Sequence, residues 1–169
     1  YILKSFVLAL GETNQKIFFL HLYLLIPFFF YKSLRIIYFK SDKNNLILLS
    51  TVLLLFPTFR SYSIWPDPHL LGTLFFIISI YFYSKFLTKK KFFKNAVLNT
   101  IFLALSAYIS PNFGVFVIFF IYEFYIKFKF TNRFIILLII NLIISLPFFF
   151  YLFYFDVSFI SNVGSWDIG

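Results

Sequence analysis

The fold is decided by the sequence LLGTLFFIISIYFYSKF at residues 70–86, which holds a single charge, Lys85, near its end. Other apolar stretches lie before and after it. The six stretches are Ile17–Tyr31, Leu46–Phe59, Leu70–Phe86, Ala96–Ile109, Phe113–Ile126 and Phe134–Phe155. A transmembrane helix needs about 20 mainly apolar residues, so flanking Tyr, Trp and Lys side chains must extend the shorter stretches into the lipid headgroups. We therefore predict about six transmembrane spans.

The composition argues against a water-soluble domain. Hydrophobic residues make up 62% of the 169 residues and charged residues 12%, and the mean hydropathy is +0.92. Too little polar surface remains to coat a soluble core. We predict an all-α, polytopic helical bundle that forms one transmembrane domain over residues 1–169. Within it, residues 1–16 should lie at the outer face, 17–155 should hold the spans, and 156–169 should begin an outer loop.

Two residue types are missing from the sequence. Without cysteine, the chain cannot form disulfides, thiolate metal sites or a thiol nucleophile. Without methionine it has no initiator, and it stops at Gly169 shortly after an apolar stretch. We therefore expect a fragment that is incomplete at both ends.

The basic residues indicate an orientation. If the first span begins outside, twelve of the 15 Lys and Arg residues fall in inner loops, and only Lys4, Lys16 and Arg60 lie outside. Lys and Arg near span ends resist translocation. We predict that both ends of the sequence lie on the non-cytoplasmic side of the membrane. The run Lys89–Lys91 is then an inner loop near anionic lipid, not a nucleic-acid site.

The loop between the second and third apolar stretches concentrates the polar chemistry of the chain. Residues 56–69 read FPTFRSYSIWPDPH, which combines a cation, an acid, an imidazole, hydroxyls and large aromatic rings. The planar donors of an arginine suit a lipid phosphate or diphosphate. The candidate site residues in this loop are Arg60, Tyr62, Trp65, Asp67 and His69.

Each of these residues also has a structural explanation. Asp67 followed by Pro68 is typical of a helix N-cap with proline at the first helical position. Tyr62 and Trp65 fit an interfacial aromatic belt. A lone imidazole such as His69, in a first helical turn, is more often a surface residue than a metal ligand. Arginine at an outer rim also binds ordinary lipid headgroups.

Two further polar positions lie outside this loop. Ser110-Pro111-Asn112, between the fourth and fifth stretches, predicts a tight hairpin at the outer face, with Asn112 as a candidate substrate-binding residue. Glu123 lies about one helical turn before Lys127, so an i,i+4 ion pair near the inner rim would explain it without a proton pathway.

The run RSYSIWPDPHLLG at residues 60–72, followed by an apolar stretch, a basic loop and LALSAYISPNF at residues 103–113, resembles the central part of the GT-C glycosyltransferases. It is most similar to protein mannosyltransferase and aminoarabinose transferase-like enzymes, the glycosyltransferase family 39-like group. The resemblance covers about residues 46–155. It implies an enzyme of a bacterial inner (plasma) membrane that transfers a hexose or pentose from a polyprenyl-phosphate donor to a glycan, lipid or protein acceptor at the outer face.

The resemblance also implies roles for individual residues. In that family an aspartate commonly opens the span after a short outer loop, and Asp67 matches this position. Two features depart from the family: the principal catalytic carboxylate of a large first outer loop would lie upstream of Tyr1, and Ser110 stands where many members have lysine. No cofactor is certain, and a divalent metal is an option. The candidate substrate contacts come from the loop and the turn themselves and are Arg60, Tyr62, Trp65, His69 and Asn112.

Two other function classes are alternatives. A transporter or flippase would show broken helices near mid-membrane or buried charges, and the prolines that we expect to kink apolar helices are Pro27 and Pro147. A non-catalytic membrane assembly subunit would be expected to carry intramembrane ionisable groups. An enzyme of the GT-C kind concentrates polar residues at one outer rim, whereas a transporter needs a polar path from face to face.

Overall fold

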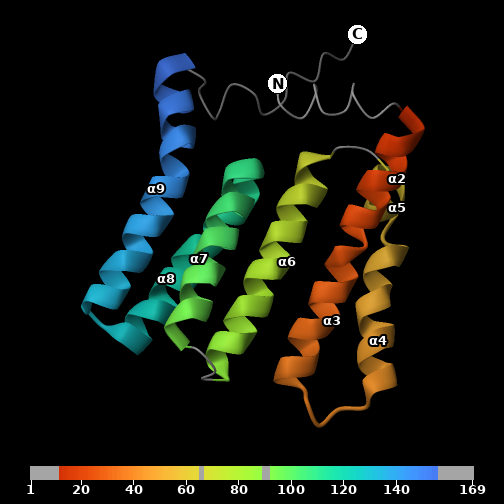
Figure 1. The fold of residues 1–169 in the computed structure, drawn as a ribbon, viewed down its shortest axis with the longest axis horizontal. Coiled ribbons are helices and arrows are strands. Elements are labelled where there is room, and N and C mark those ends of the chain that lie inside the picture. Colours follow the sequence, from red (N-terminus) through yellow and green to blue (C-terminus); the bar gives the residue numbers. More distant parts are fainter. Residues whose placement is uncertain (1–11, 65–66, 89–91, 156–169) are drawn as a thin grey trace.

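The computed structural model describes residues 12–64, 67–88 and 92–155, and the regular structure in these ranges is helical throughout (Figure 1). This confirms the all-α fold class, with several helices apolar enough to cross a membrane. The elements are α2 Glu12–Tyr23, α3 Leu25–Ile37, α4 Lys43–Thr51, η1 Val52–Leu55, α5 Pro57–Tyr62, α6 Pro68–Leu87, α7 Phe92–Ile109, η2 Pro111–Gly114, α8 Val115–Phe128 and α9 Asn132–Phe155.

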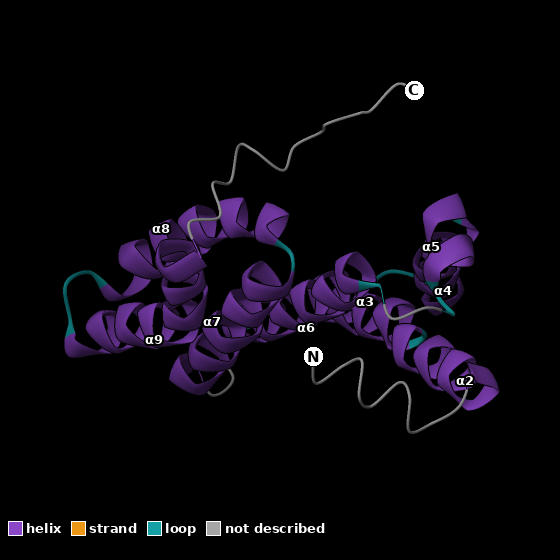
Figure 2. Cartoon of the chain, turned by 90° about the horizontal axis from the view of Figure 1, so that it is seen from above, coloured by secondary structure: helices purple, strands orange, loops and turns teal. Residues whose placement is uncertain are grey.

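The helices run up and down the bundle in alternation (Figure 1). The α3–α4 and α8–α9 connections, the end of α6 and the start of α7 lie at one end, and the end of α5, the start of α6 and the α7–η2 connection lie at the other. Seen from above, α4 and α5 stand at one side of the bundle and α8 and α9 at the opposite side (Figure 2). Helix α6 is therefore central, and it packs against both α3 and α7.

Four helical segments in the described part of the chain are long and apolar enough to cross a membrane. These segments are Thr13–Ile37, Pro68–Leu87, Phe92–Ile109 and Pro111–Phe128. Two further apolar helical segments are shorter: Lys43–Leu55, and Asn132–Pro147 within α9. The structure thus supports a multi-pass membrane protein with four candidate spans, and the larger number of six stays a prediction.

The second apolar stretch, Leu46–Phe59, is broken. Helix α4 passes into the short 3-10 helix η1, and the extended residue Phe56 then separates η1 from α5. Phe56 has φ −60° and ψ 128°, because a following proline disfavours the helical conformation. Pro57 also has no N–H group with which to continue the helix. This stretch is therefore not the single transmembrane helix that the apolar run predicts.

Prolines in the other apolar stretches have smaller effects. Helices α2 and α3 meet at Leu24, which still donates a hydrogen bond to the Leu20 carbonyl at 3.1 Å. Pro27 cannot donate to the carbonyl of Tyr23, four residues earlier, and the change between the two helices falls at this turn. Pro147 lies inside α9, which continues beyond it.

Helices α6 and α7 make the most extensive helix contact in the bundle. At Gly72 of α6, an added β-carbon would lie 2.9 Å from the Ser110 β-carbon and 3.2 Å from the Phe113 ring. Ser106 of α7 donates a hydrogen bond to the Gly72 carbonyl at 2.8 Å. Small residues and interhelical hydrogen bonds hold helices together in lipid, where the hydrophobic effect between helices is weak.

The same helix pair contains a buried amide. Asn99 of α7 is fully buried and donates to the carbonyl and the hydroxyl of Ser79 on α6, at 2.9 and 3.1 Å. Apolar clusters pack on either side of the α6–α7 pair, one toward α2, α3 and α5 and the other toward α8 and α9. The second cluster is largely aromatic and includes Phe86, Phe120, Phe124, Phe128 and Phe134.

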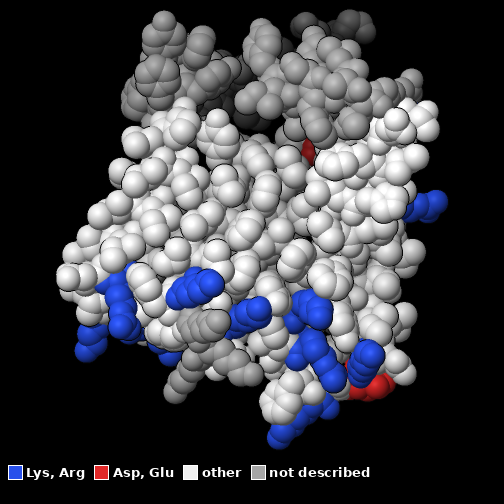
Figure 3. Space-filling view, viewed as in Figure 1, with Lys and Arg blue, Asp and Glu red and all other residues white. Residues whose placement is uncertain are grey.

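Basic side chains gather at one end of the bundle (Figure 3), the end that carries the α3–α4 and α8–α9 connections. We call it the basic end. Arg60, in α5, belongs to the opposite end, and Lys89–Lys91 lie outside the described residues. The grouping that the sequence predicts is therefore present, and the side of the membrane that each end faces stays a prediction. The basic residues at these helix ends are Lys32, Arg35, Lys40, Lys43, Lys85, Lys94, Lys127, Lys129 and Arg133.

The close approach at Gly72 can be tested by adding one methyl group. We expect Gly72→Ala to destabilise the protein by about 1–3 kcal/mol, because the new atom would overlap the Ser110 β-carbon, which cannot swing away. Gly114→Ala is the matched control, since a β-carbon there meets nothing within 4 Å. Thermal unfolding in detergent measures both variants. Equal midpoints for the two variants would contradict the close packing of α6.

The absence of cysteine allows the two ends to be assigned by chemical labelling. Lys40→Cys and Lys129→Cys place a thiol at the basic end, and Ser61→Cys and Asn112→Cys place one at the other end. All four native residues are exposed, so burial should not limit labelling. In sealed vesicles, we expect a membrane-impermeant maleimide to label one pair and spare the other. Labelling of thiols from both pairs to the same extent would contradict the arrangement.

Candidate functional site

Asp67 begins the helix that carries the site. Its backbone is extended, with φ −80° and ψ 121°, and its carboxylate oxygen Oδ1 accepts a hydrogen bond from the Leu70 N–H at 2.8 Å. Pro68 occupies the first turn, where a missing N–H has no cost. This confirms the N-cap that the sequence predicts. The Tyr23 hydroxyl donates to the Asp67 carbonyl at 3.0 Å and so ties α2 to the start of α6.

A pocket of about 450 Å³ opens beside this helix start, at the end opposite the basic end. One wall is apolar and comes from α3, η1 and α5, while the other wall is the first turn and a half of α6. The break at Phe56 belongs to the apolar wall. We call this cavity the rim pocket. Its lining residues are Ile26, Leu53, Phe56, Phe59, Asp67, His69, Leu70 and Thr73.

The polar wall of the rim pocket is held in place by local hydrogen bonds. Asp67 is half-buried and His69 is exposed. The Thr73 hydroxyl donates to the His69 carbonyl at 2.8 Å. His69 Nδ1 lies 3.1 Å from the Ser110 hydroxyl oxygen at the end of α7. The pocket therefore presents an acid and an imidazole against an apolar surface.

Ser110 is a residue of the site that the sequence did not identify as one. Only 1% of it is exposed, and its hydroxyl orients the imidazole of a residue 41 positions earlier. The sequence indicates only a turn at Ser110, and the turn itself is confirmed: α7 ends at Ile109 and η2 begins at Pro111. The hydrogen bond to His69 depends on the packing of α6 against α7, which no local pattern encodes.

Of the other predicted site residues, Arg60 and Asn112 do not line the rim pocket. Arg60 is exposed and lines a separate, open hollow of about 380 Å³ with Pro57 and Ser61. Asn112 is exposed on η2. Trp65 and the side chain of Tyr62 lie outside the described residues. The structure therefore brings together Asp67 and His69, and it places Arg60 outside the pocket that they line.

Glu123 has a different partner from the one expected. Its carboxylate oxygen Oε2 accepts a hydrogen bond from the Tyr83 hydroxyl of α6 at 2.9 Å. This bond joins α8 to α6 across 40 residues of sequence. The role of Glu123 is therefore an interhelical contact, in place of the expected ion pair with Lys127.

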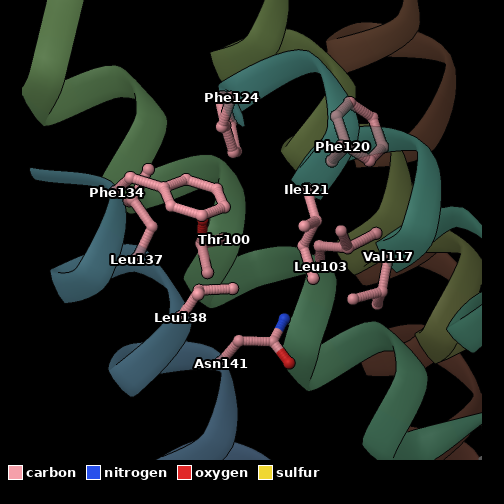
Figure 4. A pocket seen from close by; sticks show the side chains of 10 residues that line it. All are labelled: Thr100, Leu103, Val117, Phe120, Ile121, Phe124, Phe134, Leu137, Leu138 and Asn141. Atoms are coloured by element: carbon pink, nitrogen blue, oxygen red, sulfur yellow. The ribbon is translucent and has the colours of Figure 1, made fainter. Parts of the chain in front are cut away.

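A second cavity, between α7, α8 and α9, is too small to be a substrate site. Its volume of about 10 Å³ is close to the minimum for one water molecule. Figure 4 shows apolar side chains around it, with Thr100 and Asn141 as the polar members. The Thr100 hydroxyl donates to the Ala96 carbonyl at 3.0 Å. These helices therefore pack closely and leave the rim pocket as the better candidate.

The part of the chain that the structure describes offers no cluster of side chains suited to bind a metal ion. No group of three or more His, Cys, Asp or Glu side chains there could hold a metal ion. Asp67 and His69 would supply at most two protein ligands at the rim pocket.

Comparison with protein-family models, with curated proteins and with solved structures gives no match for this chain.

The structural role of Asp67 can be separated from any chemical role by two substitutions. Asp67→Ala should lower stability by about 1 kcal/mol, because it removes the N-cap acceptor, whereas Asp67→Asn should lower it by a few tenths at most because asparagine caps about equally well. Asp42→Ala is the control, since Asp42 caps the exposed start of α4 through a longer bond of 3.4 Å. Thermal unfolding in detergent measures all three. A large loss for Asp67→Asn would show that the carboxylate charge itself stabilises the fold.

Proposed function

We propose that this chain is part of a membrane glycosyltransferase that transfers a sugar from a polyprenyl-phosphate donor to an acceptor at the non-cytoplasmic face. The observation that carries the proposal is the rim pocket, where the half-buried Asp67 and the exposed His69 face an apolar wall. A polyprenyl-phosphate sugar has its reactive bond at headgroup level, directly above a long apolar chain. A pocket with one polar and one apolar wall matches both parts of such a substrate.

The proposed sugar transfer consists of three changes. The bond between the sugar and the donor phosphate breaks, a bond from the sugar to an acceptor oxygen forms, and the acceptor proton passes to a base. In our proposal Asp67 orients the acceptor or the donor headgroup, and His69 supplies a second polar contact. Arg60 neutralises the leaving phosphate from its separate, open hollow, since a cation stabilises developing negative charge. The base itself is not assigned to a described residue.

The orientation follows from the charge distribution. The basic end faces the cytoplasm, because Lys and Arg are retained there during insertion. The rim pocket then faces the opposite side of a bacterial inner membrane. The acceptor is a glycan, a lipid or a protein that reaches the membrane surface.

The pattern of buried polar groups supports an enzyme over a transporter. Buried serine, threonine and asparagine side chains do run along the α6–α7 contact. Several of these side chains bond within the helix pair: Ser106 donates to the Gly72 carbonyl, and the Asn99 amide nitrogen donates to Ser79, while the buried Asn99 Oδ1 has no hydrogen-bond partner. Side chains that are buried and bonded in this way are packing contacts. A transport path requires polar groups that line a cavity.

The proposed role of Asp67 predicts a specific loss of activity. In membranes that contain the full-length protein, Asp67→Asn should reduce sugar transfer from a radiolabelled polyprenyl-phosphate donor by about 10–100-fold, because misplacing a reacting group has effects of this size. Asp42→Asn, at an exposed cap of the basic end, is the matched control and should keep full activity.

Two measurements keep this test decisive. The amount of folded Asp67→Asn protein is determined by size-exclusion chromatography, so that lost activity is not confused with lost protein. Unchanged transfer by folded Asp67→Asn would leave Asp67 with its capping role alone. Failure of the unsubstituted protein to transfer sugar from any polyprenyl-phosphate donor would contradict the proposed function itself.

A further inference from the structure

We propose that the basic end carries a specific binding site for the headgroup of an anionic phospholipid, in the hollow between α8 and α9. This α8–α9 hollow has a volume of about 600 Å³. It lies where α8 ends and α9 begins, at the end of the bundle where basic side chains gather (Figure 3). Its lining residues are Lys127, Phe128, Thr131, Asn132 and Arg133.

The chemistry of the hollow fits a phosphate group. Lys127 and Arg133 are both exposed and bring two positive charges from different helices to one concave surface. Thr131 and Asn132 add a hydroxyl and an amide as neutral donors. Helix α9 begins at Asn132, and a helix N-terminus carries partial positive charge. None of the described residues that line the hollow is acidic, so a bound anion meets no repulsive side chain.

One of the two cations is oriented by the protein. The Arg133 guanidinium lies over the Phe93 ring of α7, 5.8 Å from the ring centroid. The ring quadrupole attracts a cation in this position and so favours one orientation of the side chain. The planar donor group of arginine can therefore meet two phosphate oxygens with little loss of side-chain freedom.

The surface beside the hollow is suited to lipid and not to a free phosphate ion. Phe130, in the α8–α9 connection, is 79% exposed, and its ring packs edge-on against Tyr125 and Phe134 at centroid distances of 5.2 and 6.1 Å. Ile126 and Ile135 are also exposed, on the adjoining turns of α8 and α9. An acyl chain covers such apolar groups while its headgroup occupies the basic hollow. Basic pockets between transmembrane helices bind anionic lipid headgroups in this way.

The experiment compares two lipids and two charge-matched variants. The purified protein in detergent is titrated with phosphatidylglycerol and, separately, with phosphatidylcholine, and bound lipid is measured by native mass spectrometry. We expect phosphatidylglycerol to bind more tightly. Lys127→Gln/Arg133→Gln should weaken phosphatidylglycerol binding by about 25-fold, since each basic side chain near an anionic lipid contributes about fivefold.

The control removes the same charge from the same end of the bundle. Lys32 and Lys40 are exposed, and each ammonium lies within 6 Å of a ring centroid, at 5.5 and 5.8 Å, as the Arg133 guanidinium does. Lys32→Gln/Lys40→Gln should therefore change binding by less than about threefold if the site is the hollow. The charge-conserving variant Lys127→Arg, which leaves Arg133 in place, should retain most of the affinity.

Three results would overturn the proposal. Equal losses in the two glutamine variants would show a general effect of net charge. Equal binding of the two lipids by the unsubstituted protein would show that the headgroup charge is not recognised. Displacement of phosphatidylglycerol by an excess of inorganic phosphate, at unchanged ionic strength, would show a site for soluble phosphate. None of these results bears on sugar transfer at the rim pocket, which lies at the opposite end.

Discussion

The close contact between α6 and α7 is the constraint on which the rest of the structure depends. Lipid offers no hydrogen-bonding partners, so helices in it associate through tight packing and through polar groups that bond each other. Gly72 permits the approach, and Ser106 bonds to its carbonyl across the interface. The same approach places Ser110 beside His69. Loss of this contact would therefore disturb both the bundle and the polar wall of the rim pocket.

The rim pocket exists because one apolar stretch fails to form a continuous helix. Pro57 ends the helical hydrogen bonding and holds Phe56 extended. Leu53 of η1, the extended residue Phe56 and Phe59 of α5 form the apolar wall of this cavity. The irregular backbone at Phe56 lines this cavity, and a cavity wall is one of the places where a membrane protein tolerates such backbone.

Features set by neighbouring residues were predictable, and features set by distant residues were not. The cap at Asp67, the turn at Ser110 and the one-sided basic residues follow from local sequence or from loop order, and the structure contains all three. The partner of Glu123 is different, because Tyr83 reaches it from another helix, whereas the i,i+4 rule considers one helix alone. The bond between His69 and Ser110 likewise spans 41 residues. Pro57 is a local signal for a break in a helix, but the apolar residues around it favoured the prediction of one continuous span.

A structural role for Asp67 does not compete with a functional one. An ionised carboxylate has two oxygens and about four acceptor positions, and the N-cap uses Oδ1 for one bond from Leu70. The cap also fixes the direction of the side chain, and the bond from Tyr23 fixes the backbone beside it. A charged group that is oriented in advance loses less freedom when it meets a substrate. The capping bond that explains Asp67 in structural terms is therefore also what would make its carboxylate useful at the edge of the pocket.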